Sequence, residues 1–549
     1  MKNQAHFSFW PPRMAKELTI PETTIFDNLA NAARKYPEKP AIKFYGGTVT
    51  YKQLFEESER VAGFIEQNFG VRRGDRVLIF MQNSPQFLIS LFAILRLRAV
   101  AVPINPMSTT EDLRFYIGDG DIRLGFVGQE LFGKVAPLIG ETSLEQAVSA
   151  AYGSYASPGN SPGTIPAEVL AGPEQIAGMV GWDELTSAGL EPSDYKGESG
   201  DLAMIPYTSG TTGLPKGCMH TNRTIQANAT GSYHWMSMTS GAVILTSLPL
   251  FHVTGLLHSA LAPIIAGSTM IMMTRWDRDY ALRAIEQYGV THWINISTML
   301  IDFLANPKLA GRDLSSLQVV GGGGATLPEA VGKKLEELTG LQYMEGYGLS
   351  ETMSHTHFNP PHRPKLQCLG IPAFGVDARI IDPATGTELG AGEEGELIVC
   401  APQQFTGYYR NEEETESSHI TLDGKRFFRT GDIVRMDEEG YFFMVDRVKR
   451  MINAAGYKVW PTEVESILYR HPAIQQACVV RAPDEIRGET VKALVILRPE
   501  YVGQVSEKEL IEWAKGQMAS YKYPRIIEFR TEFPTTTSGK ILWRELQDA

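Results

Sequence analysis

Residues 207–217 read Tyr-Thr-Ser-Gly-Thr-Thr-Gly-Leu-Pro-Lys-Gly and follow the apolar run Leu202–Ile205. Glycines let the backbone turn and approach a ligand closely, so that main-chain N–H groups can point at phosphate oxygens. Hydroxyl side chains add donors, and the lysine adds a mobile positive charge. These residues are Thr208, Ser209, Gly210, Thr211, Thr212, Gly213, Lys216 and Gly217. The stretch therefore predicts a loop that holds a polyphosphate.

Two other interpretations fit this loop less well. The Walker A loop, G-x-x-x-x-G-K-[ST], carries a Ser or Thr after its lysine to bind magnesium. Here Pro215 precedes Lys216 and Gly217 follows it, so that hydroxyl is missing. A solvent-exposed turn is the other alternative, because clusters of Gly, Ser, Thr and Pro usually mark loops. A long run of this composition, entered from an apolar segment, favours the phosphate loop.

Further motifs follow in order toward the C-terminus. They are Leu248–His252 (LPLFH), Gly321–Ala325 (GGGGA), Tyr347–Thr352 (YGLSET), Phe428–Asp432 (FRTGD), Asp446–Lys449 (DRVK) and Thr537–Lys540 (TSGK). With the first loop they resemble the signatures of the adenylate-forming superfamily, which includes acyl-CoA synthetases, aryl-CoA ligases, luciferases and the adenylation domains of peptide synthetases. The resemblance implies that ATP activates a carboxylic acid as an acyl-AMP, which then meets the thiol of CoA.

The resemblance assigns the chemistry to four residues. Lys540 matches the family's catalytic lysine, which bridges the carboxylate and the α-phosphate during adenylation. Lys216 is expected to meet the phosphates, and His252 matches a gate beside the acyl carboxylate. Glu351 corresponds to the Mg²⁺ ligand, a hard oxygen donor suited to an ion that also binds phosphate. Charge builds on the phosphates in this step, so cationic groups and a metal are the expected catalysts.

Other motif residues match the nucleotide site of the family. Tyr347 is expected to lay its ring against adenine, while the backbone of Gly323, Gly324 and Ala325 lines the other side. Ser350 stands where the family usually has Thr and keeps a hydroxyl toward phosphate.

The last group of matches lies toward the C-terminal domain. Asp432 and Arg447 match residues that hold the ribose hydroxyls, a sound use of an acidic side chain. Lys449 occupies the family's hinge, at which a small domain swings between the two half-reactions. Gly456 is expected to let the pantetheine arm of CoA pass. Many members have Gly-Gly-Glu there, whereas this chain has Ala-Gly-Tyr, as luciferases and related acyl-CoA synthetases do, which leaves an oxidase-like side reaction open.

Composition agrees with a large enzyme. The 549 residues are too many for one core, and the hydrophobic share of 43% is ordinary for globular chains. A net charge of −12 disfavours nucleic acid and anionic membranes as partners. The cysteines form no C-x-x-C pair, so we expect buried or half-buried thiols in a reducing compartment rather than zinc or disulfides; they are Cys218, Cys368, Cys400 and Cys478. Met1–Pro12 lacks a signal-peptide core, and the prediction is a cytoplasmic enzyme.

The segment Thr224–Thr274 contains no Asp, Glu, Lys or Arg. Prolines and glycines interrupt it, and it has no uniformly apolar run long enough to span a membrane. We therefore expect a buried helix, strand and helix around a pocket and no transmembrane segment. Peripheral contact with a membrane and a homodimeric state both stay open.

Short apolar runs alternate with stretches of helical spacing, as in parallel α/β folds. The runs Arg76–Phe80 and Val100–Pro103 flank a helix expected at Gln86–Arg96. The alternation recurs at Ala242–Leu248, Thr269–Met273, Tyr280–Gly289, Thr291–Ile294 and Leu317–Val320. The expected fold class is α/β, with doubly wound sheets in a large N-terminal domain.

Domain boundaries follow from changes in the pattern of expected strands, turns and helices along the sequence. Residues 1–446 are expected to form the AMP-binding N-terminal domain, with a β-rich subdomain at 372–446, and residues 447–549 a small mobile α+β domain. In the latter we expect helices at Pro461–Tyr469 and Glu507–Met518 and strands at Gln475–Val480 and Lys492–Leu497. The Gly-, Pro- and Ser-rich stretch Tyr152–Pro173 predicts an exposed, mobile insertion.

The acid itself is less constrained. An amino-acid-activating domain would place an Asp within a helix at His234–Met238, and no acidic residue occurs there. The chargeless segment favours a fatty or aromatic tail, and Gly321–Gly324 could leave room for a long chain. Some long-chain enzymes place a gating Trp where Gly255-Leu256 stand, so chain length stays open.

These features predict an AMP-forming acyl-CoA synthetase for medium- or long-chain fatty acids. An aryl or arylalkanoic acid CoA ligase is the alternative enzyme. The alternative from another class is a non-catalytic protein that binds an acyl-adenylate or a nucleotide. The presence of Lys216, Glu351 and Lys540 disfavours it.

Overall fold

The computed structural model describes residues 5–208, 214–324, 326–454, 457–484, 488–535 and 541–547. The chain forms two compact units. The first comprises Met1–Asp377, Val399–Phe428 and Glu439–Tyr441, and the second comprises Ala378–Ile398, Arg429–Glu438 and Phe442–Ala549. The domain boundary expected between residues 446 and 447 lies inside the second unit and stays a prediction.

One sheet of the first unit carries Gly321–Gly323 and Tyr347–Leu349, which belong to two of the motifs. Its strand order is β18 (Ile371–Pro372), β17 (Ser354–Phe358), β16 (Met344–Leu349), β15 (Val319–Gly323), β14 (His292–Ile296), β12 (Val243–Thr246), β13 (Thr269–Met272), β1 (Pro40–Phe44) and β2 (Gly47–Thr50). Neighbours from β16 to β1 run parallel, and β2, β17 and β18 add antiparallel edges.

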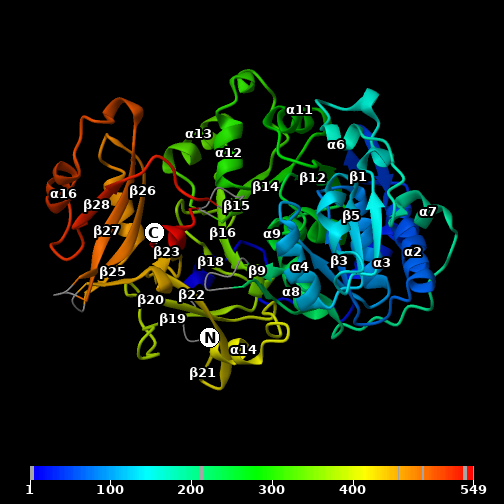
Figure 1. The fold of residues 1–549 in the computed structure, drawn as a ribbon, viewed down its shortest axis with the longest axis horizontal. Coiled ribbons are helices and arrows are strands. Elements are labelled where there is room, and N and C mark those ends of the chain that lie inside the picture. The colour runs from blue at the N-terminus through cyan, green and yellow to red at the C-terminus, as the bar shows by residue number, and fades with distance from the viewer. Residues whose placement is uncertain are drawn as a thin grey trace. The chain divides into compact units, whose positions relative to one another are not determined.

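A second sheet leads into the phosphate loop. Its order is β11 (His220–Thr221), β8 (Leu202–Met204), β4 (Val100–Pro103), β3 (Arg76–Phe80), β5 (Leu124–Gly128), β6 (Gln146–Ala150) and β7 (Val180–Gly181). Only β11 runs antiparallel among these pairings of described residues. Two mostly parallel sheets with helices between their strands confirm the doubly wound α/β prediction (Figure 1).

The helices of the first unit connect and cover these strands. They are α1 (Ile25–Lys35), α2 (Tyr51–Asn68), α3 (Pro85–Arg96), α4 (Thr110–Gly120), α5 (Phe132–Val135), α6 (Ala167–Leu170), α7 (Trp182–Ser187), α8 (Asn222–Trp235), α9 (Val253–Leu256), α10 (Ala262–Ala266), α11 (Arg278–Tyr288), α12 (Ser297–Leu304), α13 (Glu329–Thr339) and α14 (Glu412–Ser417). Single turns lie at η1 (Ala5–Phe9), η2 (Gln129–Leu131), η3 (Ala136–Leu138), η4 (Tyr152–Tyr155), η5 (Pro158–Asn160), η7 (Pro307–Leu309) and η8 (Ser350–Thr352), and η6 (Leu257–Leu261) is a π-helical turn.

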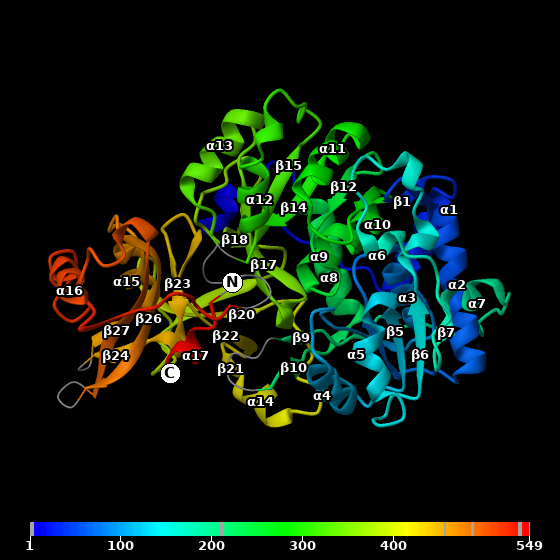
Figure 2. The ribbon, with the colours of Figure 1, turned by 45° about the horizontal axis from the view of Figure 1, so that its top comes forward.

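The core of the first unit lies around α3. Every residue of this helix is buried, as expected for a helix that is apolar on all sides. It begins at Pro85 because the Ser84 hydroxyl accepts a hydrogen bond from the Phe87 amide and Pro at the first turn has no amide to satisfy. Helix α2 packs along it, and their apolar side chains join residues of both sheets in one core (Figure 2).

Most expected elements are confirmed. The strands at Arg76–Phe80 and Val100–Pro103 have those bounds, and Thr224–Thr274 is largely buried as helix, strand and helix. The expectation that Tyr152–Pro173 is exposed holds for residues such as Pro158–Asn160 but not for the whole segment. The Tyr152 side chain is 1% exposed, accepts a hydrogen bond from the Gln82 amide and donates one to Glu130, and Val169 is also buried. Composition indicated a loop, but aromatic and aliphatic side chains fix that loop against the core.

The chain beyond Pro372 is rich in strands, as expected. They are β19 (Asp377–Ile381), β20 (Glu394–Cys400), β21 (His419–Leu422), β22 (Lys425–Met436) and β23 (Phe442–Arg447). In the first unit β21 pairs with the beginning of β22, and in the second unit the end of β22 pairs with β23.

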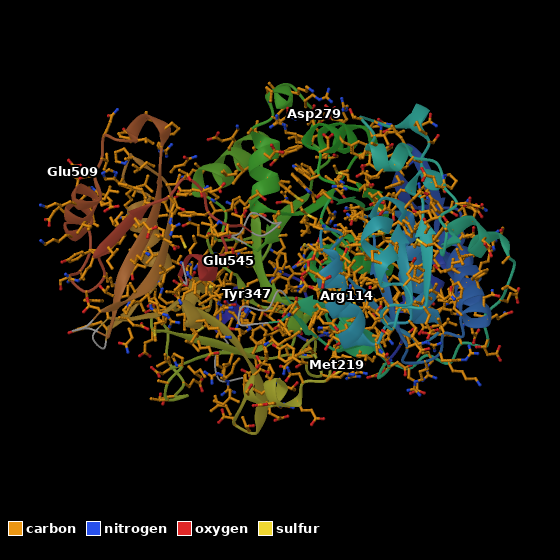
Figure 3. All side chains as sticks on the ribbon, viewed as in Figure 1. Arg114, Met219, Asp279, Tyr347, Glu509 and Glu545 are labelled. Atoms are coloured by element: carbon orange, nitrogen blue, oxygen red, sulfur yellow. The ribbon has the colours of Figure 1, made fainter. Side chains whose placement is uncertain are left out.

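The second unit also holds the C-terminal sheet, drawn in orange in Figures 1 and 2. Its order is β25 (Tyr457–Val459), β24 (Ile452–Ala454), β27 (Gly488–Leu497) and β26 (Ile474–Asp484), and β28 (Ile526–Phe529) pairs with β27. The remaining elements are η9 (Val448–Arg450), α15 (Pro461–Leu468), η10 (Pro499–Tyr501), α16 (Glu507–Lys515) and α17 (Trp543–Gln547). Glu509, labelled in Figure 3, closes a capping box with Ser506 at the start of α16. The expected α+β character is confirmed.

Strand β15 lies so close to its neighbours that it has no room for side chains at its centre. A Cβ on Gly322 would lie 1.8 Å from the Asn295 carbonyl oxygen, far inside van der Waals contact. We predict that Gly322→Ala destabilises the protein by about 3 kcal/mol or more, because rigid backbone must move. Gly118→Ala is the matched control, since a Cβ there meets nothing within 4 Å and Gly118 lies in α4; it should be neutral or slightly stabilising. Thermal melting of both variants measures this, and equal melting temperatures would contradict it.

Candidate active site

The expected phosphate loop is closed by a short hairpin. Strand β9 (Tyr207–Thr208) pairs with β10 (Lys216–Gly217), and Lys216 stands opposite Thr208. This register brings the first hydroxyl and the lysine of the motif to the same point of the loop's base. Ser209, Gly210, Thr211, Thr212 and Gly213 lie outside the described residues.

Lys216 is held by two side chains from the segment 405–414. Its ammonium forms an ion pair with Glu414 of α14 and lies 4.4 Å from the centre of the Tyr408 ring. A cation over an aromatic face at this distance is attracted by the ring's quadrupole. The lysine side chain is 20% exposed, so it is partly shielded but still reachable.

Glu351 meets the same tyrosine. The Tyr408 hydroxyl donates a 2.8 Å hydrogen bond to Oε1 of Glu351, and the Phe405 amide donates one of 2.8 Å to the Glu351 carbonyl. Burial and the nearby Glu351 charge raise the pKa of Tyr408, so its hydroxyl keeps its proton and stays a donor. Lys216 and Glu351, which the sequence predicted as partners of ATP, are therefore brought together through Tyr408.

Ser350 is anchored by a histidine from the strand after the phosphate loop. Nε2 of His220 donates a 2.8 Å hydrogen bond to the Ser350 carbonyl oxygen, and the other ring nitrogen lies 3.2 Å from the Thr224 hydroxyl. Burial lowers the pKa of His220 to about 4, so the ring is neutral near pH 7.

Sequence reasoning missed both Tyr408 and His220. The Gly407-Tyr408-Tyr409-Arg410 run offered a signal for the first, since aromatic and basic residues gather there. Nothing in the sequence indicated that Tyr408 would lie beside Glu351 and Lys216, roughly 60 and 190 positions earlier, because the fold decides which distant segments meet.

The glycine motif lies on β15 and faces β16. Cβ atoms on Gly321 and Gly323 would lie 2.5 Å from carbonyl oxygens of Met344 and Gly346. These glycines allow close strand packing and do not open space for an acyl chain, so that expectation is wrong for Gly321–Gly323. Gly324 has φ +86°, a conformation that favours glycine. Ala325 lies outside the described residues.

Tyr347, labelled in Figure 3, lies on β16 beside the glycine strand. Its ring is 8% exposed and packs edge to face against His357, with ring centres 5.9 Å apart. The pairing follows from the register, in which Tyr347 stands opposite His357. A ring fixed in this way presents a rigid face.

His252 caps the helix that follows the LPLFH motif. Its Nδ1 accepts a 3.3 Å hydrogen bond from the Thr254 amide at the start of α9, and the residue is exposed. Nearby, the buried His258 ring hydrogen-bonds Ser232 (2.8 Å) and Ser354 (3.3 Å). Ser354 also lies 3.5 Å from the Thr254 hydroxyl, so this polar chain adjoins the helix that His252 caps.

In the second unit the structure brings Asp432 and Arg447 together. They stand opposite each other in β22 and β23, and their side chains form a 2.9 Å ion pair. Asp432 is fully buried, whereas Arg447 is 34% exposed. The pair fixes the carboxylate in place.

Lys449 lies next, in the exposed part of η9. The following residue is well anchored, since Arg450 pairs with Glu465 of α15, whose carboxylate also accepts a hydrogen bond from the Val479 amide. Two contacts also bridge Lys449, since Asp446 lies 3.8 Å from the Arg450 guanidinium and accepts a 2.7 Å hydrogen bond from the Thr462 amide. Gly456 and Lys540 lie outside the described residues.

The donor set around Glu351 fits Mg²⁺. Within the described residues, no three side chains of His, Cys, Asp or Glu form a metal cluster. Mg²⁺ is commonly held by one or two carboxylates together with substrate phosphates rather than by an all-protein cage. A single carboxylate close to a phosphate-loop lysine suits that arrangement.

Two wider expectations can be compared with the structure. The four cysteines are free thiols, with Cys218, Cys368 and Cys478 buried and Cys400 half-buried, as expected. In the ranges that the structure describes, no helix has the length and apolar character to cross a bilayer.

A lysine and a carboxylate that both contact Tyr408, at the base of the expected phosphate loop, are groups that a nucleotide-dependent enzyme requires. Comparison with protein families agrees: residues 29–409 match the family described as AMP-binding enzyme, and residues 463–540 match the AMP-binding enzyme C-terminal domain. The chain therefore belongs to the AMP-binding enzyme family, and the resemblance drawn from its motifs is confirmed.

Individual relatives cover almost the whole chain. It is 35% identical to a long-chain-fatty-acid–CoA ligase of Bacillus subtilis, over 98% of this chain and 96% of that protein. It is 31% identical to a feruloyl-CoA synthase of Amycolatopsis, over 94% and 96%. Among solved structures, ATP-bound MatB from Rhodopseudomonas palustris is similar with a TM-score of 0.82 and 26% identity, covering 96% of this chain and 99% of that one.

One buried carboxyl on β16 predicts a pH dependence of stability. Glu345 is 4% exposed and accepts hydrogen bonds from the amides of Gln367 (2.6 Å) and Leu327 (3.3 Å), and burial raises its pKa to about 7. The folded protein keeps this proton at pH values where the unfolded chain releases it. The free energy of unfolding therefore falls as the pH rises from about 4.5 to 7.

We predict that, as the pH rises from 4.5 to 7.5, the unfolding free energy of Glu345→Gln increases by roughly 3 kcal/mol relative to that of wild type. The glutamine carries no charge at either pH, whereas the wild-type carboxyl ionises. Denaturant unfolding of both proteins across this range measures the difference. A difference that does not change with pH would contradict the raised pKa.

Proposed function

We propose that the protein is an AMP-forming acyl-CoA synthetase that activates a long-chain fatty acid. The observation that carries the proposal is the cluster of Lys216, Tyr408 and Glu351 beside the hairpin of Thr208 and Lys216. It supplies a cation for the phosphates and a hard anionic oxygen for their metal. Similarity over nearly the full chain to a long-chain-fatty-acid–CoA ligase supports the substrate class.

The reaction has two steps. A carboxylate oxygen of the acid attacks the α-phosphorus of ATP, the bond to the bridging oxygen breaks, and pyrophosphate leaves. The CoA thiol, after losing its proton, then attacks the acyl carbon, and AMP leaves with the electron pair of the anhydride bond. Lys216 and the loop residues 208–213 bind the phosphates, and Lys540 bridges the carboxylate and the α-phosphate.

Glu351 would hold Mg²⁺, which neutralises charge on the phosphates when bound. Ser350 presents its hydroxyl toward the phosphates from the same turn. The His220 hydrogen bond to the Ser350 carbonyl supports this role, because it fixes the turn that carries both residues. In the acyl site, His252 would act as the gate beside the carboxylate.

The nucleoside would be held by the residues that match the nucleotide motifs of the family. Tyr347 offers its fixed ring to adenine, with the backbone of Gly323, Gly324 and Ala325 opposite. Asp432 accepts hydrogen bonds from the ribose hydroxyls, and Arg447 assists. The 2.9 Å ion pair supports this role, because a carboxylate that is already oriented loses little freedom on binding.

The second step requires a different arrangement of the C-terminal domain. Lys449 would be the hinge. A backbone rotation there would keep the Asp432–Arg447 and Arg450–Glu465 pairs and would break the contacts of Asp446 with Arg450 and with the Thr462 amide. Gly456 would then let the pantetheine arm pass. We also propose that the enzyme works in the cytoplasm, a compartment in which free cysteines stay reduced.

An aryl or arylalkanoic acid is the second candidate substrate. The polar residues Ser232, His258 and Ser354, which hydrogen-bond one another near the helix that His252 caps, favour it, because a ring hydroxyl could join these hydrogen bonds and an alkyl tail could not. Similarity to a feruloyl-CoA synthase points the same way. The buried side chains of η6, including Leu257 and Leu261, favour the alkyl tail.

Pyrophosphate release with palmitate, octanoate and ferulate, followed by detection of the CoA thioester, tests the proposal. We expect kcat/KM for palmitate to exceed that for ferulate at least tenfold. A preference for ferulate would establish the second candidate. Pyrophosphate without thioester would reject the CoA step, and no release with any acid would reject both.

Lys540→Ala should reduce adenylation by at least about a thousandfold, because a charge that bridges both reactants in the transition state is lost. Thioester formation from supplied palmitoyl-AMP and CoA should stay within about threefold of wild type, since that step does not use the lysine. Rapid-quench assays of each half-reaction measure this. Equal loss in both would reject the assigned role.

Lys449→Pro should give the reverse pattern and thereby serves as the reciprocal control. A fixed φ at the hinge should restrict rotation and slow thioester formation by about tenfold or more, while adenylation changes little. The same two assays apply. A larger defect in adenylation would show that residue 449 is not the hinge.

A further inference from the structure

We infer that Tyr408 is a positioning residue that sets both Glu351 and Lys216 for one Mg²⁺·ATP. The inference rests on the proposed function. The two charged residues contact different parts of the tyrosine: the Lys216 ammonium lies 4.4 Å from the ring centre, and Glu351 accepts a 2.8 Å hydrogen bond from the hydroxyl.

The backbone around Tyr408 is fixed to the strand that leaves the phosphate loop. The Tyr409 amide donates to the Gly217 carbonyl (2.8 Å), and the Met219 amide donates to the Gly407 carbonyl (3.0 Å). Cys218 and Tyr408 form the antiparallel bridge between these contacts. Any shift of the phosphate-loop exit, which Met219 marks in Figure 3, therefore moves the tyrosine with it.

The side chain is equally constrained. Tyr408 is 4% exposed, its ring packs edge to face on Phe405 at 4.8 Å, and its amide donates to the Thr415 hydroxyl at 2.9 Å. The Phe405 amide also bonds the Glu351 carbonyl, so backbone and side chain of the glutamate are tied to one segment. A phenol held this firmly directs its hydroxyl to one carboxylate oxygen and limits rotation of the carboxylate.

This arrangement solves an electrostatic problem. A lysine and a glutamate that both serve ATP attract each other, and a direct ion pair would have to break before phosphate and metal could bind. Tyr408 separates these two charges, because it offers a ring face to Lys216 and a hydroxyl to Glu351. The remaining ion pair of Lys216 is with Glu414 on the surface helix α14, and phosphate would replace Glu414 as its partner.

The two contacts can be separated by mutation. Tyr408→Phe keeps the ring beneath Lys216 and removes only the bond to Glu351, so it should weaken the use of Mg²⁺. Tyr408→Leu removes both contacts, so it should also weaken nucleotide binding without metal. Tyr409→Phe is the matched control. It removes a hydroxyl from the residue next to Tyr408, and the ring of Tyr409 packs with Arg410.

The decisive readout is binding of the α,β-methylene analogue of ATP by calorimetry, with and without Mg²⁺ and without acid. For Tyr408→Phe we expect the affinity gained from Mg²⁺ to fall about tenfold, with metal-free affinity within twofold of wild type. Tyr409→Phe should match wild type in both affinities, and Tyr408→Phe, which keeps the buried ring, should melt within about 2 °C of wild type.

A double-mutant cycle with Glu351→Gln shows whether Tyr408 acts through the glutamate. In that background Tyr408→Phe should cause no further loss of the Mg²⁺-dependent gain. An additive loss, or an unchanged gain in the single variant, would overturn the inference while wild type still binds nucleotide. A wild-type protein that binds no analogue at all would instead overturn the proposed function, and the inference with it.

Discussion

The main-chain pairing between Gly217–Met219 and Gly407–Tyr409 is the constraint on which the rest of the site depends. It joins the exit of the phosphate loop to a segment about 190 residues later. Because Tyr408 lies in that pairing, its side chain reaches Lys216 on one side and Glu351 on the other. The pairing therefore connects Lys216 to Glu351 through Tyr408.

Burial makes this constraint effective. Tyr408 and Cys218 lie almost wholly out of water, and His220 holds the Ser350 turn from beneath. A hydrogen bond is stronger in such surroundings than in water, and leaving one of its partners unbonded costs free energy. The two charged side chains stay at the edge of this buried cluster, where a nucleotide could exchange for their present partners. In the second unit Asp432 and Arg447 follow the same principle, with a buried acid oriented by a half-exposed base.

Much of the fold was predictable from local pattern. Runs such as Arg76–Phe80 alternate with helical stretches, and their order specifies parallel strands. The failures have physical causes. Composition marked Tyr152–Pro173 as mobile, but the buried Tyr152 hydroxyl and Val169 anchor it. The Gly321–Gly323 run suggested an open channel, whereas strand spacing alone requires those glycines.

The residues proposed for the site could be predicted from the sequence where they belong to motifs, as Lys216, Glu351 and Asp432 do. Tyr408 and His220 could not, since their importance comes from contacts between segments distant in sequence. The most direct measurement is exchange of labelled pyrophosphate into ATP with palmitate present and CoA absent. Label should enter ATP only when acid is added, because an acyl-AMP forms reversibly on the enzyme. Exchange that ignores the acid, or none with palmitate, octanoate or ferulate, would contradict adenylation as the activity of this protein.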